Sequence, residues 1–226
     1  MALGFLWDTL LRLLGGVPLT LELAALSVAA GAVLALVLTG LRLSSLPGAL
    51  FVRGYAYAFR GSPLLVQMFL IYYGLGQFPV VRHSALWPFL REPFWCAVLA
   101  LALNTAAYGS EILRGGLAAV PAGAVEAGRA CGMSRALLFR RVTLPLAMAQ
   151  ALPAYGSEVI IMVKSTSLAS IITLMEVTGI AQEIIATTYR AFAVFTCAAA
   201  IYLAINFAIS RGVARAERRL APGGVA

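Results

Sequence analysis

Residues 126–145, EAGRACGMSRALLFRRVTLP, interrupt an otherwise hydrophobic sequence with four arginines, one glutamate and two glycines. Upstream, Pro121 suits the first turn of a helix, where its missing N–H has no intrahelical partner to lose. Gly132 suits a left-handed helix end, and Ser134 suits the N-cap of a second helix. Pro145 is expected to stop that second helix. The pattern therefore predicts two short helices that meet at an angle.

The composition around this stretch indicates an integral membrane protein. Of 226 residues, 62% are hydrophobic and only 12% are charged, whereas a soluble domain is about half apolar and about a quarter charged. Of the 17 cations, 16 are arginine and the formal net charge is +8. These cations lie between apolar runs rather than on a basic face with interleaved aromatics, so nucleic-acid binding is not expected.

Five apolar segments are long enough to cross a bilayer, which takes about 20 residues in a helix. The fold class predicted is all-α, a helical bundle in one membrane domain, residues 1–226. Residues 1–16 are expected to be an amphipathic segment outside the membrane. The predicted spans are residues 17–41, 51–74, 94–113, 147–174 and 191–210.

The arginines between the spans predict the orientation of the chain. Twelve of them fall on one side of the predicted spans and four on the other. The richer side should be cytoplasmic. Five spans then place the N-terminus outside, the C-terminus inside, and the loop of residues 118–145 in the cytoplasm. Without further information, that loop could equally be a surface helix held by anionic membrane lipid.

Chemistry-bearing motifs are absent from the sequence. The three cysteines and one histidine lack metal-ligand spacing, and no GxxxxGK[ST] loop is present to hold nucleotide phosphates. Neither a Ser/His/Asp arrangement nor a carboxylate pair set for hydrolysis is evident. The chain is therefore predicted to be non-catalytic, with no metal and no cofactor of its own.

The cytoplasmic loop resembles the EAA loop of ABC importer permeases. The resemblance rests on Glu126, Ala127 and Gly128, then Gly132, then Leu144 and Pro145. It implies that these residues form a coupling helix that docks on a cytoplasmic ATPase. Gly128 replaces the usual third-position alanine, and Ala124 stands where the family usually has glutamine.

Three further stretches resemble the polar amino-acid branch of these permeases. They are FRGSPLLVQMFLIYYGLG (59–76), NTAAYGSEILRGG (104–116) and LPAYGSEVIIMVKSTSLASIITLMEV (152–177). The phrases within them are similar to the M-type permeases of arginine and histidine/lysine/ornithine systems. The resemblance implies a bacterial inner-membrane subunit with a second homologous permease, a periplasmic amino-acid-binding protein and a dimeric ATPase that binds ATP and Mg²⁺.

Charges inside a bilayer are costly and usually functional, which makes Glu158 the first candidate for substrate contact. Glu158, Met162 and Ser165 share one helix face through i, i+4 and i+7 spacing. A carboxylate there suits a basic amino acid, as the family resemblance also implies. The alternative is a structural ion pair or an interhelical hydrogen bond.

Asn104 is a second candidate for substrate contact, because it lies near the middle of the third predicted span. Glu111 is three residues from Arg114, so a local salt bridge is expected there. Glu22 should reach the outer interface. Lys164 lies on a different face from Glu158, and its role is left open.

The residues and the resemblance together predict a permease subunit of an ATP-driven importer of polar, basic amino acids. Two alternatives come from other classes: an ion-coupled secondary transporter, which should show inverted repeats, and a membrane adaptor that does not transport. Within the importer hypothesis, a neutral substrate such as glutamine and a homodimer remain as alternatives.

Overall fold

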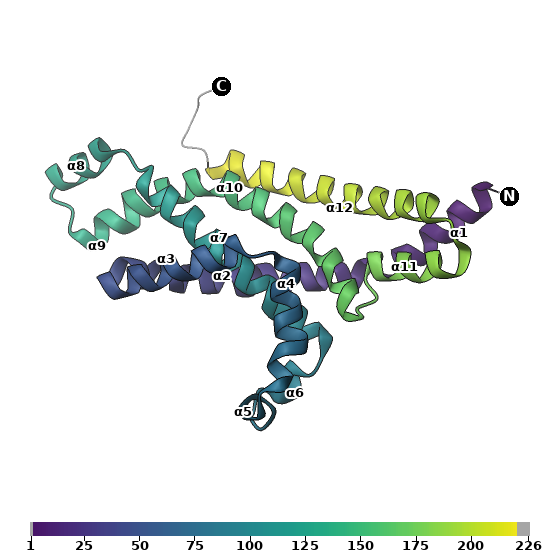
Figure 1. Ribbon diagram of the computed structural model, residues 1–226. Coiled ribbons are helices and arrows are strands. Elements are labelled where there is room, and N and C mark those ends of the chain that lie inside the picture. Colours follow the sequence, from purple (N-terminus) through teal and green to yellow (C-terminus); the bar gives the residue numbers. More distant parts are fainter. Residues whose placement is uncertain (1, 221–226) are drawn as a thin grey trace.

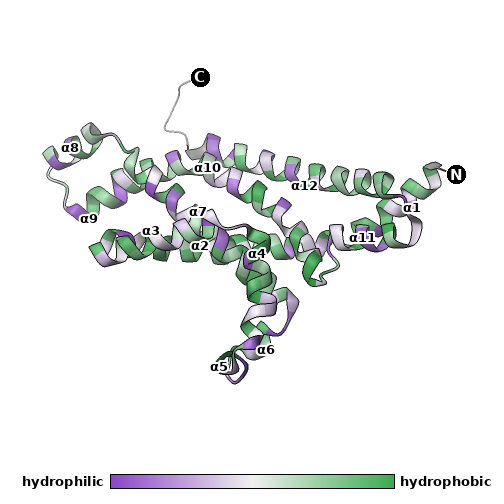
Figure 2. Ribbon diagram, in the orientation of Figure 1, coloured by the Kyte–Doolittle hydropathy of each residue, from purple (hydrophilic) through white to green (hydrophobic). Residues whose placement is uncertain are grey.

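The structure is a computed structural model that describes residues 2–220, and within that range it contains helices and no strands. The longest helices run side by side, and green hydrophobic residues dominate them (Figures 1 and 2). This confirms the all-α membrane class. The main helices are α1 (Ala2–Leu14), α2 (Val17–Ser44), α3 (Leu46–Gly61), α7 (Pro93–Ala118), α10 (Leu144–Ser165) and α12 (Ala191–Leu220).

Four helical stretches in the described residues are long and apolar enough to cross a membrane. They coincide with the first, third, fourth and fifth predicted spans. The first stretch also includes α1, which continues into α2 through a turn at Gly15 and Gly16. The four are Leu3–Ser44, Pro93–Ala118, Arg135–Ile172 and Ala191–Arg218.

The second predicted span, residues 51–74, is broken rather than continuous. Helix α3 ends at Gly61, and Ser62 and Pro63 are extended, with ψ angles of 146° and 132°. A proline disfavours helical geometry in the residue before it, which explains the break at this point. The chain then continues through α4 (Leu64–Phe69), the π turn η1 (Leu70–Gly74) and the 3-10 turn η2 (Leu75–Gln77).

The region after this break forms an arm that projects away from the long helices (Figure 1). Two short helices lie in it, α5 (Pro79–Arg82) and α6 (Trp87–Leu90), where the sequence predicted only a loop. Aromatic side chains remain exposed on the arm, including Phe78 and Phe89. Such rings suit a membrane interface.

The two short helices predicted around the arginine-rich stretch are present as α8 (Ala122–Ala130) and α9 (Arg135–Leu138). Gly132 has a φ of 73°, and the Ser134 side chain accepts a hydrogen bond from the Leu137 N–H, as expected. The prediction that Pro145 ends the second helix is wrong. The π turn η3 (Phe139–Thr143) leads directly into α10, and a proline near the start of that helix is tolerated.

Helix α7 is the centre of the bundle and packs most extensively against α2 and α10. Small residues permit this approach: a Cβ on Gly31 of α2 would overlap Thr105 of α7. A second apolar cluster joins α1 and α12 to α11 (Val177–Thr188). The 3-10 turn η4 (Thr166–Ile172) connects α10 to this second part.

Buried Glu176, at the start of α11, ties the second part together. Its carboxylate accepts hydrogen bonds from the Gly179 N–H at 2.9 Å and from the Tyr202 hydroxyl of α12 at 2.6 Å. The Thr20 hydroxyl of α2 donates to it at 3.4 Å. Each donor is neutral, and together they offset the cost of burying the acid.

Candidate functional site

Glu158 lies on α10 with its side chain turned into the bundle, and only 6% of the residue is exposed. It makes no salt bridge within the described residues. The charge of Arg60, at the end of α3, acts on the Glu158 carboxylate, and Thr105 of α7 lies beside it. A buried carboxylate without an ion pair, inside a membrane helix, is a candidate for ligand contact.

Arg60 is held in place by an aromatic ring rather than by an acid. Its guanidinium lies 5.1 Å from the centre of the Tyr108 ring of α7, a cation–π arrangement. In the described part of the chain it forms no ion pair. Sequence reasoning counted Arg60 only as a topology charge. Its place directly before the Gly61–Pro63 break was the signal that could have marked it.

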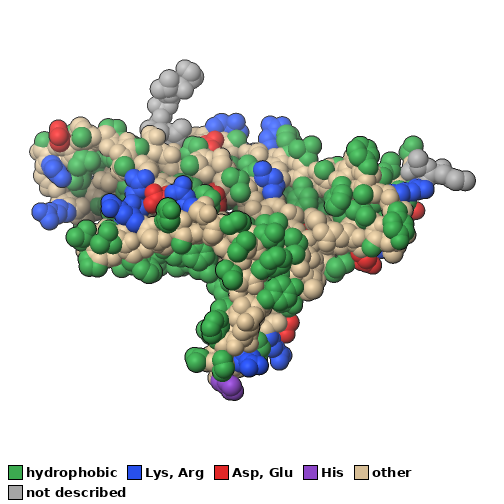
Figure 3. All heavy atoms as spheres, in the orientation of Figure 1, with side chains coloured by type: hydrophobic (Ala, Val, Ile, Leu, Met, Phe, Trp, Pro, Cys, Tyr) green, Lys and Arg blue, Asp and Glu red, His purple; other side chains and the backbone are tan. Residues whose placement is uncertain are grey.

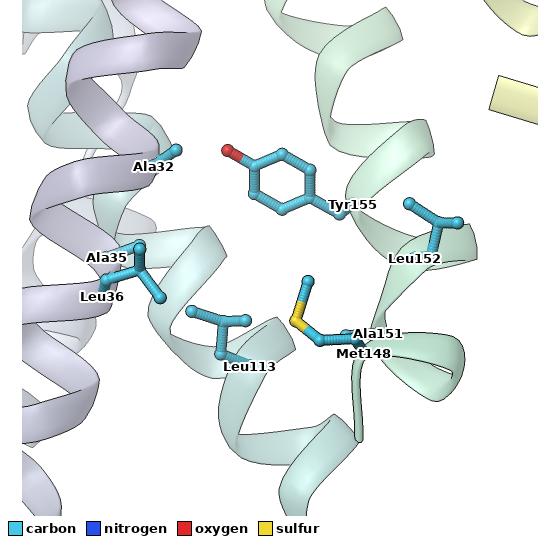
Figure 4. A pocket seen from close by; sticks show the side chains of 8 residues that line it. All are labelled: Ala32, Ala35, Leu36, Leu113, Met148, Ala151, Leu152 and Tyr155. Carbon is cyan, nitrogen blue, oxygen red and sulfur yellow. The ribbon is translucent and has the colours of Figure 1, made fainter. Parts of the chain in front are cut away.

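Two buried hydroxyls near Glu158 also lack partners. Thr105 Oγ1 and Tyr155 Oη are buried and form no hydrogen bond within residues 2–220. Figure 4 shows the Tyr155 hydroxyl pointing toward Ala32 across an apolar cavity of about 170 Å³ between α2, α7 and α10. Unpartnered buried hydroxyls are uncommon and costly, so both are candidates for ligand contact that the sequence did not indicate.

The other predicted members of the Glu158 face are arranged differently. Met162 is 1% exposed and packs into the main apolar core. Ser165 is half-buried, and its hydroxyl donates to the Ile161 carbonyl at 2.9 Å. The structure therefore keeps Glu158 and Met162 on one buried face, while Ser165 lies at its edge with an oxygen still able to accept.

Asn104 contributes to the helix break. Its amide nitrogen donates to Gln67 Oε1 at 3.1 Å and to the Phe59 carbonyl at 3.2 Å. The Gln67 amide nitrogen in turn donates to the Phe59 carbonyl at 2.7 Å and to both oxygens of Ser62. These bonds satisfy the carbonyls that the break releases, and they leave only the Asn104 carbonyl oxygen for a substrate.

The expected salt bridge between Glu111 and Arg114 is present, at 2.8 Å. Arg42 of α2 pairs with the other carboxylate oxygen of Glu111. Glu22 and Lys164 are exposed, and neither forms a salt bridge within the described residues. Glu111 is thus accounted for within this chain.

Helix α8 presents Glu126 and Ala127 to solvent, whereas Gly128 is buried. A side chain at Gly128 would overlap the tip of Leu138 on α9. The Gly128 carbonyl also accepts from the Met133 N–H at 3.2 Å, which closes the helix end around left-handed Gly132. Gly128 and Gly132 therefore fix the angle at which α8 holds its exposed face.

Leu144 and Pro145 lie at the start of α10, where both are exposed. A groove of about 470 Å³ lies between α8 and the α9–η3 segment that precedes this helix. Arg129 and Arg135 line it together with apolar side chains. The predicted coupling residues thus lie on α8, in the turn after it and at the start of α10, toward the end of the molecule that bears α8 and α9 (Figure 1).

No group of three or more histidine, cysteine, aspartate or glutamate residues suited to a metal occurs in residues 2–220. The buried polar groups include two hydrogen-bonded clusters, around Gln67 and around Glu176, and Glu158, which forms no salt bridge in the described residues.

Residues 22–222 match a family described as the binding-protein-dependent transport system inner membrane component. The chain belongs to this family. It is a permease subunit of an ABC amino-acid importer, a non-catalytic multi-pass protein of the bacterial inner membrane. Membership of this family decides against the secondary-transporter and adaptor alternatives.

Several curated relatives are permeases named for octopine, for nopaline or for histidine, lysine, arginine and ornithine. The octopine transport system permease protein OccM of Rhizobium meliloti is 60% identical and aligns over 96% of this chain and 89% of its own length. The nopaline permease NocM of Agrobacterium fabrum is 54% identical, over 93% and 88% respectively. The histidine/lysine/arginine/ornithine permease HisM of Escherichia coli K12 is 43% identical, over 90% and 87%.

Among solved structures, an amino acid ABC transporter crystallised with histidines has a chain that matches this permease with a TM-score of 0.85. The two are 36% identical, and the match covers 97% of this chain and 98% of the other. The MetNI methionine transporter, at 19% identity and a TM-score of 0.73, shares the fold.

Proposed function

We propose that this permease forms half of the translocation pathway for a basic amino acid or an opine-type derivative of one. The names of the octopine, nopaline and HisM relatives support this substrate class. The observation that carries it is buried Glu158, which faces Arg60 without pairing to it. A neutral amino acid such as glutamine would leave that carboxylate without a cationic partner.

The two charges suit the two ends of a basic amino acid. The Arg60 guanidinium can bind the α-carboxylate in a bidentate manner, and Glu158 can accept from a guanidinium, ammonium or imidazolium side chain. The remaining contacts proposed are the Asn104 carbonyl oxygen, the Ser165 hydroxyl and the Met162 thioether. Tyr155 and Thr105 supply additional hydroxyls.

The proposed topology has five crossings, with the broken α3–α4 segment as the second. The N-terminus is outside and the C-terminus inside, and residues 1–16 lie on the periplasmic side. Helix α8, with Glu126 and Ala127 exposed, docks on the ATPase, which binds the ATP and Mg²⁺. Figure 1 supports this arrangement, because α8 and α1 lie at opposite ends of the long helices.

The proposed partners are a second homologous permease, a dimeric ATPase, a periplasmic binding protein and the surrounding membrane lipid. Helix α3 and the arm expose apolar side chains such as Leu46, Leu50 and Leu70, which are available to a partner or to lipid. A heterodimer is proposed because the M-type permeases that this chain resembles pair with a similar but distinct permease.

The test is ATPase activity and uptake in liposomes that contain the complete complex. Wild type is compared with Glu158→Gln and with the control Glu22→Gln, whose glutamate is exposed. Arginine, histidine, octopine and glutamine are offered in turn on the binding protein. We expect stimulation by the cationic substrates, about 100-fold weaker uptake in Glu158→Gln, and normal uptake in the control.

Three other results would change the proposal. Strong stimulation by glutamine alone would transfer the substrate to the neutral class. Normal uptake by Glu158→Gln would keep the importer and remove the site. A permease that assembles with no ATPase would contradict the coupling role of α8.

A further inference from the structure

A polar pocket lies between α3 and α7 and shares Arg60 with the proposed substrate site. Its volume is about 400 Å³. Figure 3 shows basic side chains gathered beside an acidic one over this part of the molecule. The lining residues are Arg53, Ala56, Tyr57, Arg60, Gly61 and Glu111.

The lining of the pocket has more basic than acidic side chains. Glu111 is its only acid, and both carboxylate oxygens of Glu111 are already paired, one with Arg42 and the other with Arg114. Arg53 and Arg60 form no salt bridge within residues 2–220. Two free guanidinium groups at one pocket indicate an anionic ligand.

The spacing on α3 directs both groups toward the same ligand. Arg53, Tyr57 and Arg60 fall at i, i+4 and i+7, so they share one helix face. Seven residues separate the two arginines by about 10 Å along the helix. Gly61 leaves space beside Arg60, because a Cβ there would meet no other atom within 4 Å.

Arg60 belongs to both sites, because it also faces Glu158. In the proposed function, a simple basic amino acid has one carboxylate, which Arg60 binds. Arg53 would then have no partner. A ligand with two carboxylates and one cationic side chain would use Arg53, Arg60 and Glu158 together.

We propose that Arg53 forms a subsite for the additional carboxylate of an N-carboxyalkyl amino acid, the chemical class of the opines. This inference rests on the proposed function and refines its substrate class. The guanidinium fork of Arg53 binds the second carboxylate, and the exposed Tyr57 hydroxyl can donate to it. An anionic lipid headgroup offers similar oxygens, so the experiment must separate the two ligands.

The test compares octopine and arginine uptake by the complete complex in liposomes of neutral lipid, with binding protein present. The variants are Arg53→Gln, Arg53→Lys and the control Arg82→Gln, whose arginine lies at the end of α5 on the arm. We expect Arg53→Gln to lower the ratio of kcat/KM for octopine to that for arginine about tenfold. Arg53→Lys should restore part of the ratio, and the control should leave it unchanged.

Each other outcome has a distinct meaning. If wild type transports neither compound, the proposed function is wrong. If wild type transports both and Arg53→Gln leaves the ratio unchanged, the subsite is wrong although the function stands. If the ratio changes only when anionic lipid is included, Arg53 binds a headgroup and the subsite proposal is also wrong.

Discussion

Two polar clusters both involve the end of α3, and the protein uses them in opposite ways. In the first, Asn104 and Gln67 form hydrogen bonds to each other and to the carbonyls at the helix break. In the second, Glu158 and Arg60 face one another without an ion pair within the described chain. The side-chain amides of the first cluster are hydrogen-bonded to one another and to the backbone. The charged groups of the second cluster form no salt bridge in the described residues.

This difference distinguishes buried polar groups that stabilise the fold of a membrane protein from buried polar groups that bind a ligand. A buried polar group that has found its partners stabilises the fold, whereas one left without partners lowers stability unless a ligand supplies them. The first cluster should therefore respond to substitution mainly through stability, and the second mainly through transport.

The largest expected effect is on the second cluster. Arg60→Gln removes the cation whose charge acts on Glu158 and the proposed partner of the substrate carboxylate. Arginine uptake by the reconstituted complex should fall about 100-fold, since hydrogen bonds to charged groups contribute about 1.5–3 kcal/mol each. The thermal unfolding midpoint in detergent should change little. A midpoint that falls in parallel with uptake would place Arg60 among the structural residues.

The next effect is on the first cluster. Gln67→Leu removes the donor to the Phe59 and Ser62 carbonyls and one acceptor of Asn104. We expect a loss of about 2 kcal/mol in unfolding free energy, since interhelical hydrogen bonds in membranes contribute about 0.6–1.7 kcal/mol each. The matched control is Gln77→Leu, whose amide bonds only the exposed Tyr73 carbonyl. Equal losses of unfolding free energy in both variants would show that the Gln67 hydrogen bonds do not stabilise the helix break.

Much of the fold follows from the sequence because hydrophobic length and arginine placement act locally. Four of the five predicted spans coincide with long apolar helices, and the Gly132 and Ser134 signals fixed the shape of the α8–α9 loop. The break at Pro63 was missed because the residues on both sides are apolar enough to form one span. The prediction that Pro145 ends a helix was wrong, because the π turn η3 leads directly into α10 and Pro145 lies in the first turn of that helix.

The candidate site was less predictable, because its members come from three helices. Glu158 was found from a local rule, that an acid in an apolar run is costly. Arg60 and Thr105 lie far from it in the sequence, and only packing brings them near. Conversely, Asn104 fits the pattern of a substrate ligand, but its amide nitrogen is bound to Gln67, which the sequence could not reveal.

A smaller loss of stability is expected where a substitution removes a single hydrogen bond made by a hydroxyl group. The Tyr55 hydroxyl of α3 donates to the Leu103 carbonyl of α7 at 2.6 Å. Tyr55→Phe should therefore lower the unfolding free energy by about 1 kcal/mol, measured by thermal unfolding in detergent. Uptake kinetics should stay near wild type, because this hydrogen bond joins α3 to α7 and has no proposed contact with the substrate. A changed KM with unchanged stability would reverse that assignment.

The smallest stability effect is expected for Tyr155→Phe, the counterpart of Tyr55→Phe. The Tyr155 hydroxyl is buried without a partner in the described residues, so its removal breaks no hydrogen bond and relieves a desolvated group. The unfolding midpoint should stay the same or rise slightly. If the hydroxyl contacts substrate instead, KM for arginine should rise about two- to tenfold, the contribution of one neutral hydrogen bond. A fall in stability equal to that of Tyr55→Phe would mean that Tyr155 has a structural partner, and the distinction between satisfied and unsatisfied groups would then fail at this residue.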